Sequence, residues 1–252
     1  MTALLTCMFV QVAVLVHGSS MDISSVLNET HSVLDSFYPG MYGAKAIAET
    51  IFGLSVPGGK LPWTYYHTNF TERISMDEFS CAVGPGRGYR YLDPEDRDII
   101  LPFGHGLSYT SFSSTLVSPA TFHFDTTSAH VSSLNISFAV TNTGSTFAGT
   151  ETVMAFIRPG NRTNPGGSKL LPLQRRLCGY GKIGPIPVGA SATGVIELEA
   201  SDLAMADATG SLAWLPGDYS IILSRGCIGE PEITVPLRIS GGRRVVWTLP
   251  EI

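Results

Sequence analysis

The sequence predicts an α/β part, with a partial parallel sheet and helices, followed by an all-β sandwich. Residues 11–18 form a near-continuous apolar run, as expected of a parallel strand covered on both faces. Residues 41–52 repeat apolar side chains at helical spacing. From about residue 114 the chain changes to short runs of β type separated by turn residues. We therefore assign residues 1–113 to the α/β part and residues 114–252 to the sandwich.

The α/β part is expected to run strand, helix, strand, helix. Residues 21–30 supply a short helical crossover, and SVLDSF at 32–37 forms a second short strand. The following helix ends at Gly53, and Pro57 prevents its continuation. Its apolar face consists of Met41, Ala44, Ile47, Ala48, Ile51 and Phe52. Two strands are too few for a stable, doubly covered sheet, so we predict the end of an α/β layer and not a complete one.

A long connection rich in aromatic residues, 60–112, joins the two parts, and we call it the wrap. A connection of this length in a compact protein needs anchors. We expect its aromatic side chains to hold it onto the sheet of the α/β part. These side chains are Tyr89, Tyr91, Phe103, Tyr109 and Phe112.

The second part contains several runs of strand type. LNISFAVTN at 134–142 and TETVMAFIRP at 150–159 are predicted to be two strands around the turn Thr143-Gly144. Further strands are predicted at LQRRLCGYGKI, TGVIELEA, DYSIILSR and EITVPLRIS. Strands at this spacing, with turn residues between them, indicate a sandwich.

Composition excludes some partners and sites. The net charge of −5 and the pI near 5.6 argue against a nucleic-acid partner, and the basic pairs Arg175-Arg176 and Arg243-Arg244 are too short to follow a phosphate backbone. The four cysteines form no C-x-x-C pair and no His–Cys ligand spacing, so no metal site is expected. A disulfide between Cys178 and Cys227 is left open by the sequence.

Four N-x-[ST] sequons favour a secretory-pathway or secreted protein. Their asparagines are Asn28, Asn69, Asn135 and Asn161. Residues 3–16 are apolar but too short to span a bilayer, and no Lys or Arg precedes them. Two interpretations of the N-terminus stay open: the start of a core strand, or a signal peptide within residues 1–20.

Three blocks of the chain resemble one enzyme family. They are YPGMYGAKAIAETIFGLSVPGGKLPWTYY at 38–66, GRGYRYLD at 86–93 and LPFGHGLSYTSF at 101–112. In this order and spacing they are similar to the end of the α/β sandwich domain of glycoside hydrolase family 3. FAVTNTGSTFAGTETVMAFI and WLPGDYSIILSRG resemble the fibronectin-III-like (immunoglobulin-like) domain that follows it in many members.

The resemblance implies an activity whose catalytic groups lie outside this chain. The family removes β-linked sugars from non-reducing ends with retention, using no metal or organic cofactor. Retention needs two carboxylates about 5 Å apart. In the family the nucleophile lies on an upstream barrel, and the acid/base residue lies upstream in the sandwich or in a loop that this chain also lacks. The resemblance therefore implies no catalytic residue here. The SMDEF…GPGRGYRY arrangement favours the β-xylosidase branch over the β-glucosidase branch.

Some residues of this chain are still candidates for contact with sugar. Arg87, Tyr89 and Arg90 interleave guanidinium and aromatic groups, which can stack on sugar rings or can lock the wrap in place. Asp22 follows a strand end, where α/β proteins often place functional groups, but a helix N-cap explains it more simply.

Two hypotheses follow. The first is the C-terminal part of a family 3 glycosidase acting on a β-linked oligosaccharide, which is inactive alone because the barrel is missing. The alternative is a secreted, non-catalytic fibronectin-III-like module that binds glycan or protein.

Overall fold

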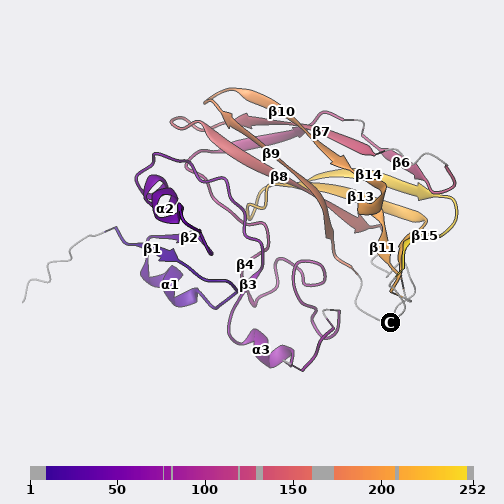
Figure 1. Ribbon diagram of the computed structural model, residues 1–252, viewed down its shortest axis with the longest axis horizontal. Helices are drawn as coiled ribbons and strands as arrows, with labels where there is room; N and C mark the ends of the chain where they lie inside the picture. The colour runs from indigo at the N-terminus through magenta and orange to yellow at the C-terminus, as the bar shows by residue number, and fades with distance from the viewer. Residues whose placement is uncertain are drawn as a thin grey trace, which may run out of the picture.

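The computed structural model describes residues 10–75, 77–80, 82–118, 120–128, 133–160, 173–207 and 210–248. Figure 1 shows the α/β part at one end of the molecule, the wrap below, and large β-sheets across the top. Most of the described regular structure is β-strand. None of the described helices has the length and apolar character needed to cross a membrane.

The α/β part follows the predicted order. Strands β1 (Val12–Leu15) and β2 (Ser32–Asp35) pair in parallel and are linked by helix α1 (Ser24–Glu29). Helix α2 (Gly43–Ile51) follows. Gly53 lies just after this helix with φ of +71°, in the left-handed conformation in which glycine ends helices.

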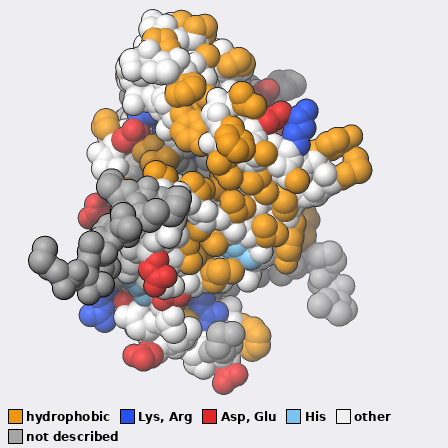
Figure 2. Space-filling model, turned by 90° about the vertical axis from the view of Figure 1, so that its left-hand side faces the viewer, with side chains coloured by type: hydrophobic (Ala, Val, Ile, Leu, Met, Phe, Trp, Pro, Cys, Tyr) orange, Lys and Arg blue, Asp and Glu red, His pale blue; other side chains and the backbone are white. Residues whose placement is uncertain are grey.

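The burial predicted for the first strand of this part is wrong. The apolar run around β1 was expected to be covered on both faces, yet Val12, Val14 and Val16 are 41%, 37% and 60% exposed. The apolar stripe of α2 also faces outward, with Met41 and Phe52 84% and 79% exposed, and Figure 2 shows hydrophobic side chains gathered on this side of the molecule. The reason is that a two-stranded sheet offers too little surface for both its helices and its own side chains to be buried.

The wrap contains little regular structure. Strands β3 (Tyr65–Tyr66) and β4 (Ile99–Leu101) pair antiparallel, and helix α3 (Phe70–Arg73) lies between them in the chain.

The aromatic anchors of the wrap contact the sandwich, which corrects the expectation that they hold it to the parallel sheet. The rings of Tyr89 and Phe103 stack with centroids 4.1 Å apart, and both meet the ring of Phe156, on the sandwich strand β8 (Gly149–Pro159), edge-on. Phe112 is buried in the core of the sandwich. Tyr109 reaches the α/β part, where its hydroxyl donates to the carbonyl of Thr50 on α2 at 2.8 Å. The rings pack here because Met154, Phe156 and Ile222 of β8 and β13 (Gly217–Ser224) form a small apolar cluster that Tyr89 and Phe103 cover.

The β part is built from a five-stranded sheet, a three-stranded sheet and a smaller set of strands (Figure 1). The five-stranded sheet has the order β6 (Phe122–Asp125), β14 (Ile233–Ser240), β13 (Gly217–Ser224), β8 and β9 (Arg176–Ile186). The three-stranded sheet has the order β10 (Ser191–Leu198), β7 (Leu134–Asn142) and β5 (Phe112–Leu116). The smaller set is β11 (Met205–Ala206), β12 (Leu212–Trp214) and β15 (Arg244–Trp247), preceded by the 3-10 helix η1 (Ala200–Leu203).

The strands β7 and β8, predicted on either side of a turn, belong to different sheets. The predicted boundary between residues 113 and 114 falls inside β5, whose first residue, Phe112, already faces the core.

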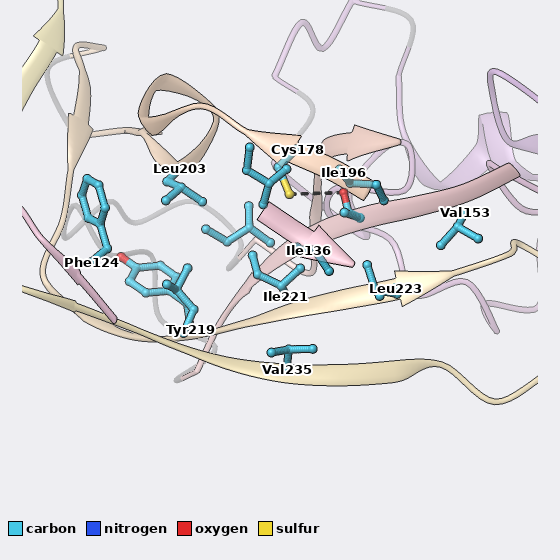
Figure 3. Packing of buried hydrophobic residues seen from close by; sticks show 14 of the residues in the cluster. Phe124, Ile136, Val153, Cys178, Ile196, Leu203, Tyr219, Ile221, Leu223 and Val235 are labelled. Carbon is cyan, nitrogen blue, oxygen red and sulfur yellow. Dashed lines mark hydrogen bonds between the residues drawn. The ribbon is translucent and has the colours of Figure 1, made fainter. Parts of the chain in front are cut away.

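The hydrophobic core lies between the two larger sheets (Figure 3). β7 contributes Ile136, Phe138 and Val140, each 0% exposed, at the two-residue spacing of a strand with one buried face. Gly181 and Gly194 on neighbouring strands make room for the Phe138 ring, because a Cβ on Gly194 would lie 2.6 Å from it. The core therefore depends on small residues beside a large one.

The structure has no bond between Cys178 and Cys227, so the disulfide left open by the sequence is not formed. Both thiols are free. Cys178 points into the core, where its S–H donates to the carbonyl of Ala155 at 3.2 Å (dashed line in Figure 3). Cys227 lies beside the wrap, 3.4 Å from the carbonyl oxygen of Gly106. The two side chains thus pack against different parts of the protein. Cys7 and Cys81 lie outside the described residues.

We expect the fold to lose stability at alkaline pH through Cys178. Burial raises the pKa of this thiol from 9.0 to about 12, so the folded state holds its proton more tightly than the unfolded state does. The stabilisation is fully present below pH 9 and is lost as the pH rises from there toward 12. Urea unfolding at several pH values should therefore show a shallower alkaline loss in Cys178→Ala than in the parent chain. Equal slopes would contradict the assignment.

Candidate functional site

The three candidate sugar-contact residues of the wrap, Arg87, Tyr89 and Arg90, have different surroundings in the structure. Tyr89 is packed between the wrap and the sandwich, and its hydroxyl accepts the N–H of Leu177 at 3.3 Å. Arg87 donates to the carbonyl of Ser75 at 2.7 Å, which ties two turns of the wrap together. Arg90 is exposed, and its carbonyl accepts the N–H of Gln174. The packing of Tyr89 favours the structural interpretation for that residue and leaves the guanidinium of Arg90 facing solvent.

A buried polar cluster lies where the two parallel strands end. His17 follows β1, Asp35 ends β2, and the carboxyl ends of parallel strands meet at one edge of a sheet. The Nε2 atom of His17 lies 3.0 Å from the hydroxyl of Tyr65 and 3.3 Å from Oδ1 of Asp35. The Tyr65 hydroxyl also donates to Asp35 Oδ2, and burial raises the pKa of this tyrosine above its ordinary value. With Tyr65 1% exposed, the cluster joins β1 and β2 to β3 and leaves no group free for a ligand.

Asp22 acts as a hydrogen-bond acceptor for two backbone segments. It accepts the backbone N–H and the hydroxyl of Ser24, at 2.9 and 2.6 Å, and those of Thr68, at 2.7 and 2.8 Å. These bonds, with Ser24 contributing most, hold the pKa of Asp22 well below its ordinary value. The N-cap position of α1 belongs to Ile23, one residue later than predicted, although Asp22 still satisfies the first helical N–H. A carboxylate held ionised in this way is a poor proton donor.

Two further carboxylates are brought together by Arg73. Its guanidinium donates to Asp96, at 2.6 Å, and to Asp98, whose side chain is 2% exposed. The bond from Arg73 lowers the pKa of Asp96. Glycosidase chemistry needs one carboxyl of a pair to keep a proton near neutral pH. The shared arginine therefore makes this pair a structural clamp across the wrap.

The junction between wrap and sandwich contains a buried charge cluster. Glu151 on β8 has a side chain 4% exposed, and its two oxygens contact Lys60 Nζ at 2.9 Å and Arg225 Nη1 at 3.3 Å. Arg225 also pairs with Glu230, and Lys60 lies 3.4 Å from the carbonyl oxygen of Gly106. One carboxylate thus joins the wrap, β8 and the loop after β13. Glu151 could not be singled out from the sequence, where its only signal is an acidic residue inside an otherwise largely buried strand.

The comparisons with known proteins agree on one family. Residues 4–109 match the model of the glycosyl hydrolase family 3 C-terminal domain. This chain carries the C-terminal domain of glycoside hydrolase family 3. A xylan 1,4-β-xylosidase of Xylanibacter ruminicola is 34% identical over 223 residues, which are 87% of this chain and 23% of that enzyme. The β-D-xylosidase 1 of Arabidopsis thaliana is 28% identical over 218 residues, which are 75% of this chain and 27% of the enzyme.

Two solved glycosidase structures share the fold of this chain. An exo-β-xylosidase in complex with a xylobiose aziridine probe superposes with a TM-score of 0.80 at 23% identity, over 95% of this chain and 32% of that one. A β-glucosidase of Listeria innocua in complex with glucose superposes with a TM-score of 0.69 at 18% identity, over 92% of this chain and 31% of that one. The chain therefore spans between 23% and 32% of the length of these four relatives.

The remaining sequence-based expectations concern surface groups. Asn28, Asn69 and Asn135 are exposed, as glycan acceptors must be, and Asn161 lies outside the described residues. Among the described residues, no group of three or more His, Cys, Asp or Glu side chains is placed to hold a metal ion.

Proposed function

We propose that this chain is the C-terminal portion of a family 3 glycosidase that removes β-linked xylose units from non-reducing ends. In this account residues 1–113 complete the α/β sandwich and residues 114–252 form a fibronectin-III-like domain. The observation that carries the proposal is the 34% identity, over 87% of the chain, to the xylan 1,4-β-xylosidase of Xylanibacter ruminicola. The xylosidase relatives favour xylosides, and glucosides are the second candidate substrates.

Within such an enzyme this chain has a structural role and supplies no catalytic group. Its best-connected charged groups bind one another: Glu151 binds Lys60 and Arg225, and Arg73 binds Asp96 and Asp98. The Glu151 cluster fixes the wrap against the sandwich and the Arg73 cluster holds the wrap together, and groups locked in this way do not transfer protons to a substrate. The catalytic carboxylates then come from the remaining polypeptide, and Arg90 is a candidate for sugar contact at the surface of the wrap.

The isolated chain should therefore not hydrolyse glycosides. We expect the purified chain, at micromolar concentration, to release no nitrophenol from nitrophenyl β-D-xyloside or β-D-glucoside above the buffer rate. The whole Xylanibacter ruminicola xylosidase serves as the positive control in the same assay. Turnover by the isolated chain at a rate typical of enzymes, on the order of 1 s⁻¹ or more, would contradict the proposal.

A secreted binding module is the second candidate. The buried core between the two larger sheets favours it, because such a core can support folding without the α/β part. This alternative requires affinity for glycan or protein by the isolated chain. A glycan array probed with the purified chain distinguishes it from the first proposal, which expects no specific binding.

Secretion is part of both proposals. The exposure of Asn28, Asn69 and Asn135 supports it. Expression in a secretory host should add glycans that peptide N-glycanase removes, and an unchanged mass would argue against this part of the proposal.

A further inference from the structure

His105 lies where a turn of the wrap, residues 102–106, meets the loop that follows β13. The N–H of Leu61 donates to the carbonyl of His105 at 2.8 Å, and the N–H of His105 donates to the carbonyl of Pro102 at 3.1 Å. The turn and the loop touch through their backbones, because a Cβ added to Gly226 would overlap the carbonyl oxygen of Gly104. The surroundings of His105 therefore depend on close contact between the wrap and the sandwich.

The Nδ1 atom of His105 is buried and has no hydrogen-bond partner among the described residues. A neutral imidazole can leave one ring nitrogen as an unused acceptor, whereas an imidazolium carries an N–H group on both nitrogens. Protonation of Nδ1 would therefore bury a charged donor that has no acceptor, which is more costly than leaving a neutral group unpaired. The closed junction requires the neutral form of the ring.

The charged groups of this junction are already balanced without a contribution from His105. They are two cations and two carboxylates in a chain of ion pairs, Lys60, Glu151, Arg225 and Glu230. The thiol of Cys227 lies beside them, and burial raises its pKa, so it stays uncharged near neutral pH. A protonated His105 would add a third cation to a set in which Lys60 and Arg225 are each only 9% exposed.

The pKa of His105 is lowered from its ordinary value of 6.5 by these surroundings. Burial contributes most and the charge of Lys60 comes second, while a hydrogen bond with the backbone of Gly226 opposes them. Below pH 6.5 the unfolded chain therefore binds a proton at this residue more readily than the folded chain does. The stability that depends on a neutral His105 is fully present above pH 6.5 and is lost progressively as the pH falls.

We propose that His105 is an acid-sensitive latch, whose protonation in mildly acidic solution releases the turn 102–106 from the loop after β13. At neutral pH the uncharged ring allows the ion pairs of the junction to stay closed. In acid the imidazolium obtains an acceptor for Nδ1, and separation from Lys60, only when the turn lifts and water enters. The link between the wrap and the sandwich thus responds to pH. The inference concerns contacts within this chain and does not rest on the proposed function.

Amide hydrogen exchange measures this opening at two reporter groups. The N–H of Leu61 donates to the carbonyl of His105, and the N–H of Gly104 donates to the carbonyl of Leu61, each at 2.8 Å. Below pH 6.5 we expect the protection of both amides, corrected for the intrinsic exchange rate at each pH, to fall by up to about tenfold per pH unit. Both should also be less protected than the amides of β7, because the latch opens while the sandwich stays folded.

Two glutamine variants separate His105 from the other titrating groups. His105→Gln has no imidazole to protonate, so the protection of the two reporter amides should no longer depend on this proton between about pH 7.5 and about pH 5, a range above the ordinary titration of carboxyl groups. His123→Gln makes the same change at an exposed position of β6 and should keep the pH dependence of the parent chain.

A proton NMR titration of the parent chain tests the latch even if His105→Gln fails to fold. The ring protons of His105 should titrate at a lower pH than those of the exposed His123. Three outcomes overturn the proposal. They are equal titration midpoints for the two histidines, an unchanged pH dependence of the reporter amides in folded His105→Gln, and reporter amides as strongly protected as those of β7, which would mean that they exchange only when the whole chain unfolds.

Discussion

Replacing Glu151 with glutamine is expected to lower the free energy of unfolding by about 3–5 kcal/mol. The carboxylate is buried and contacts Lys60 and Arg225, whose side chains are each 9% exposed. Glutamine has nearly the same shape but no charge, so two cations are left in a poorly hydrated site with one partner fewer. Arg225 keeps Glu230, whereas Lys60 keeps only a 3.4 Å contact to the carbonyl oxygen of Gly106. Lys60 should therefore account for most of the loss.

Urea unfolding followed by circular dichroism measures this effect. Glu197→Gln makes the same change at an exposed position of β10 and should alter the free energy of unfolding by no more than about 0.5 kcal/mol. Adding Lys60→Gln to Glu151→Gln should restore part of the loss, because it removes the unpaired charge. If Glu151→Gln is as mild as its control, the buried cluster does not join wrap and sandwich as described.

Replacing Phe156 with alanine is expected to cost about 3–5 kcal/mol as well. The ring is 1% exposed and receives Tyr89 and Phe103 from the wrap edge-on, with centroids 5.9 and 6.3 Å away. The guanidinium of Arg175 lies over the same ring at 4.8 Å. Its removal opens a cavity and also takes away the surface on which the wrap is anchored. We therefore expect both a lower free energy of unfolding and a less ordered wrap.

Limited trypsin digestion separates the two consequences. The wrap contains Arg73, Arg87, Arg90 and Arg97, so a loosened wrap should be cut there in Phe156→Ala at urea concentrations where the sandwich is still folded. Phe79→Ala, at an exposed ring, is the control and should digest like the parent chain. Equal digestion of the two variants would show that the wrap has other anchors.

The positions of several strands and of the helix α2 could be predicted from local sequence patterns. The turn signals and apolar runs predicted β7 and β14 almost to the residue, and the helical spacing predicted α2. These elements depend on contacts with near neighbours in the chain, which periodicity records directly.

Contacts between residues far apart in the chain could not be predicted in the same way. Periodicity shows that α2 has an apolar stripe but not whether anything covers it, and in the structure the stripe is largely exposed. The same limit explains why the packing surface of the wrap was predicted wrongly. A run of aromatic residues indicates that the segment is anchored, but it does not indicate which surface the rings contact. Glu151 is a further example, since its partners lie 91 and 74 residues away in the chain, at Lys60 and Arg225. The cluster of His17, Asp35 and Tyr65 likewise joins three separate segments.

The most direct test of the account is hydrolysis of nitrophenyl β-D-xyloside by a chimera in which this chain replaces the matching region of the Xylanibacter ruminicola xylosidase. The xylosidase without its matching region and the isolated chain should both be inactive. We predict that joining them restores turnover and that the chimera prefers the xyloside to the glucoside. A soluble chimera with a single cooperative melting transition and no turnover on either substrate would contradict the assignment of this chain to a family 3 β-glycosidase of this kind.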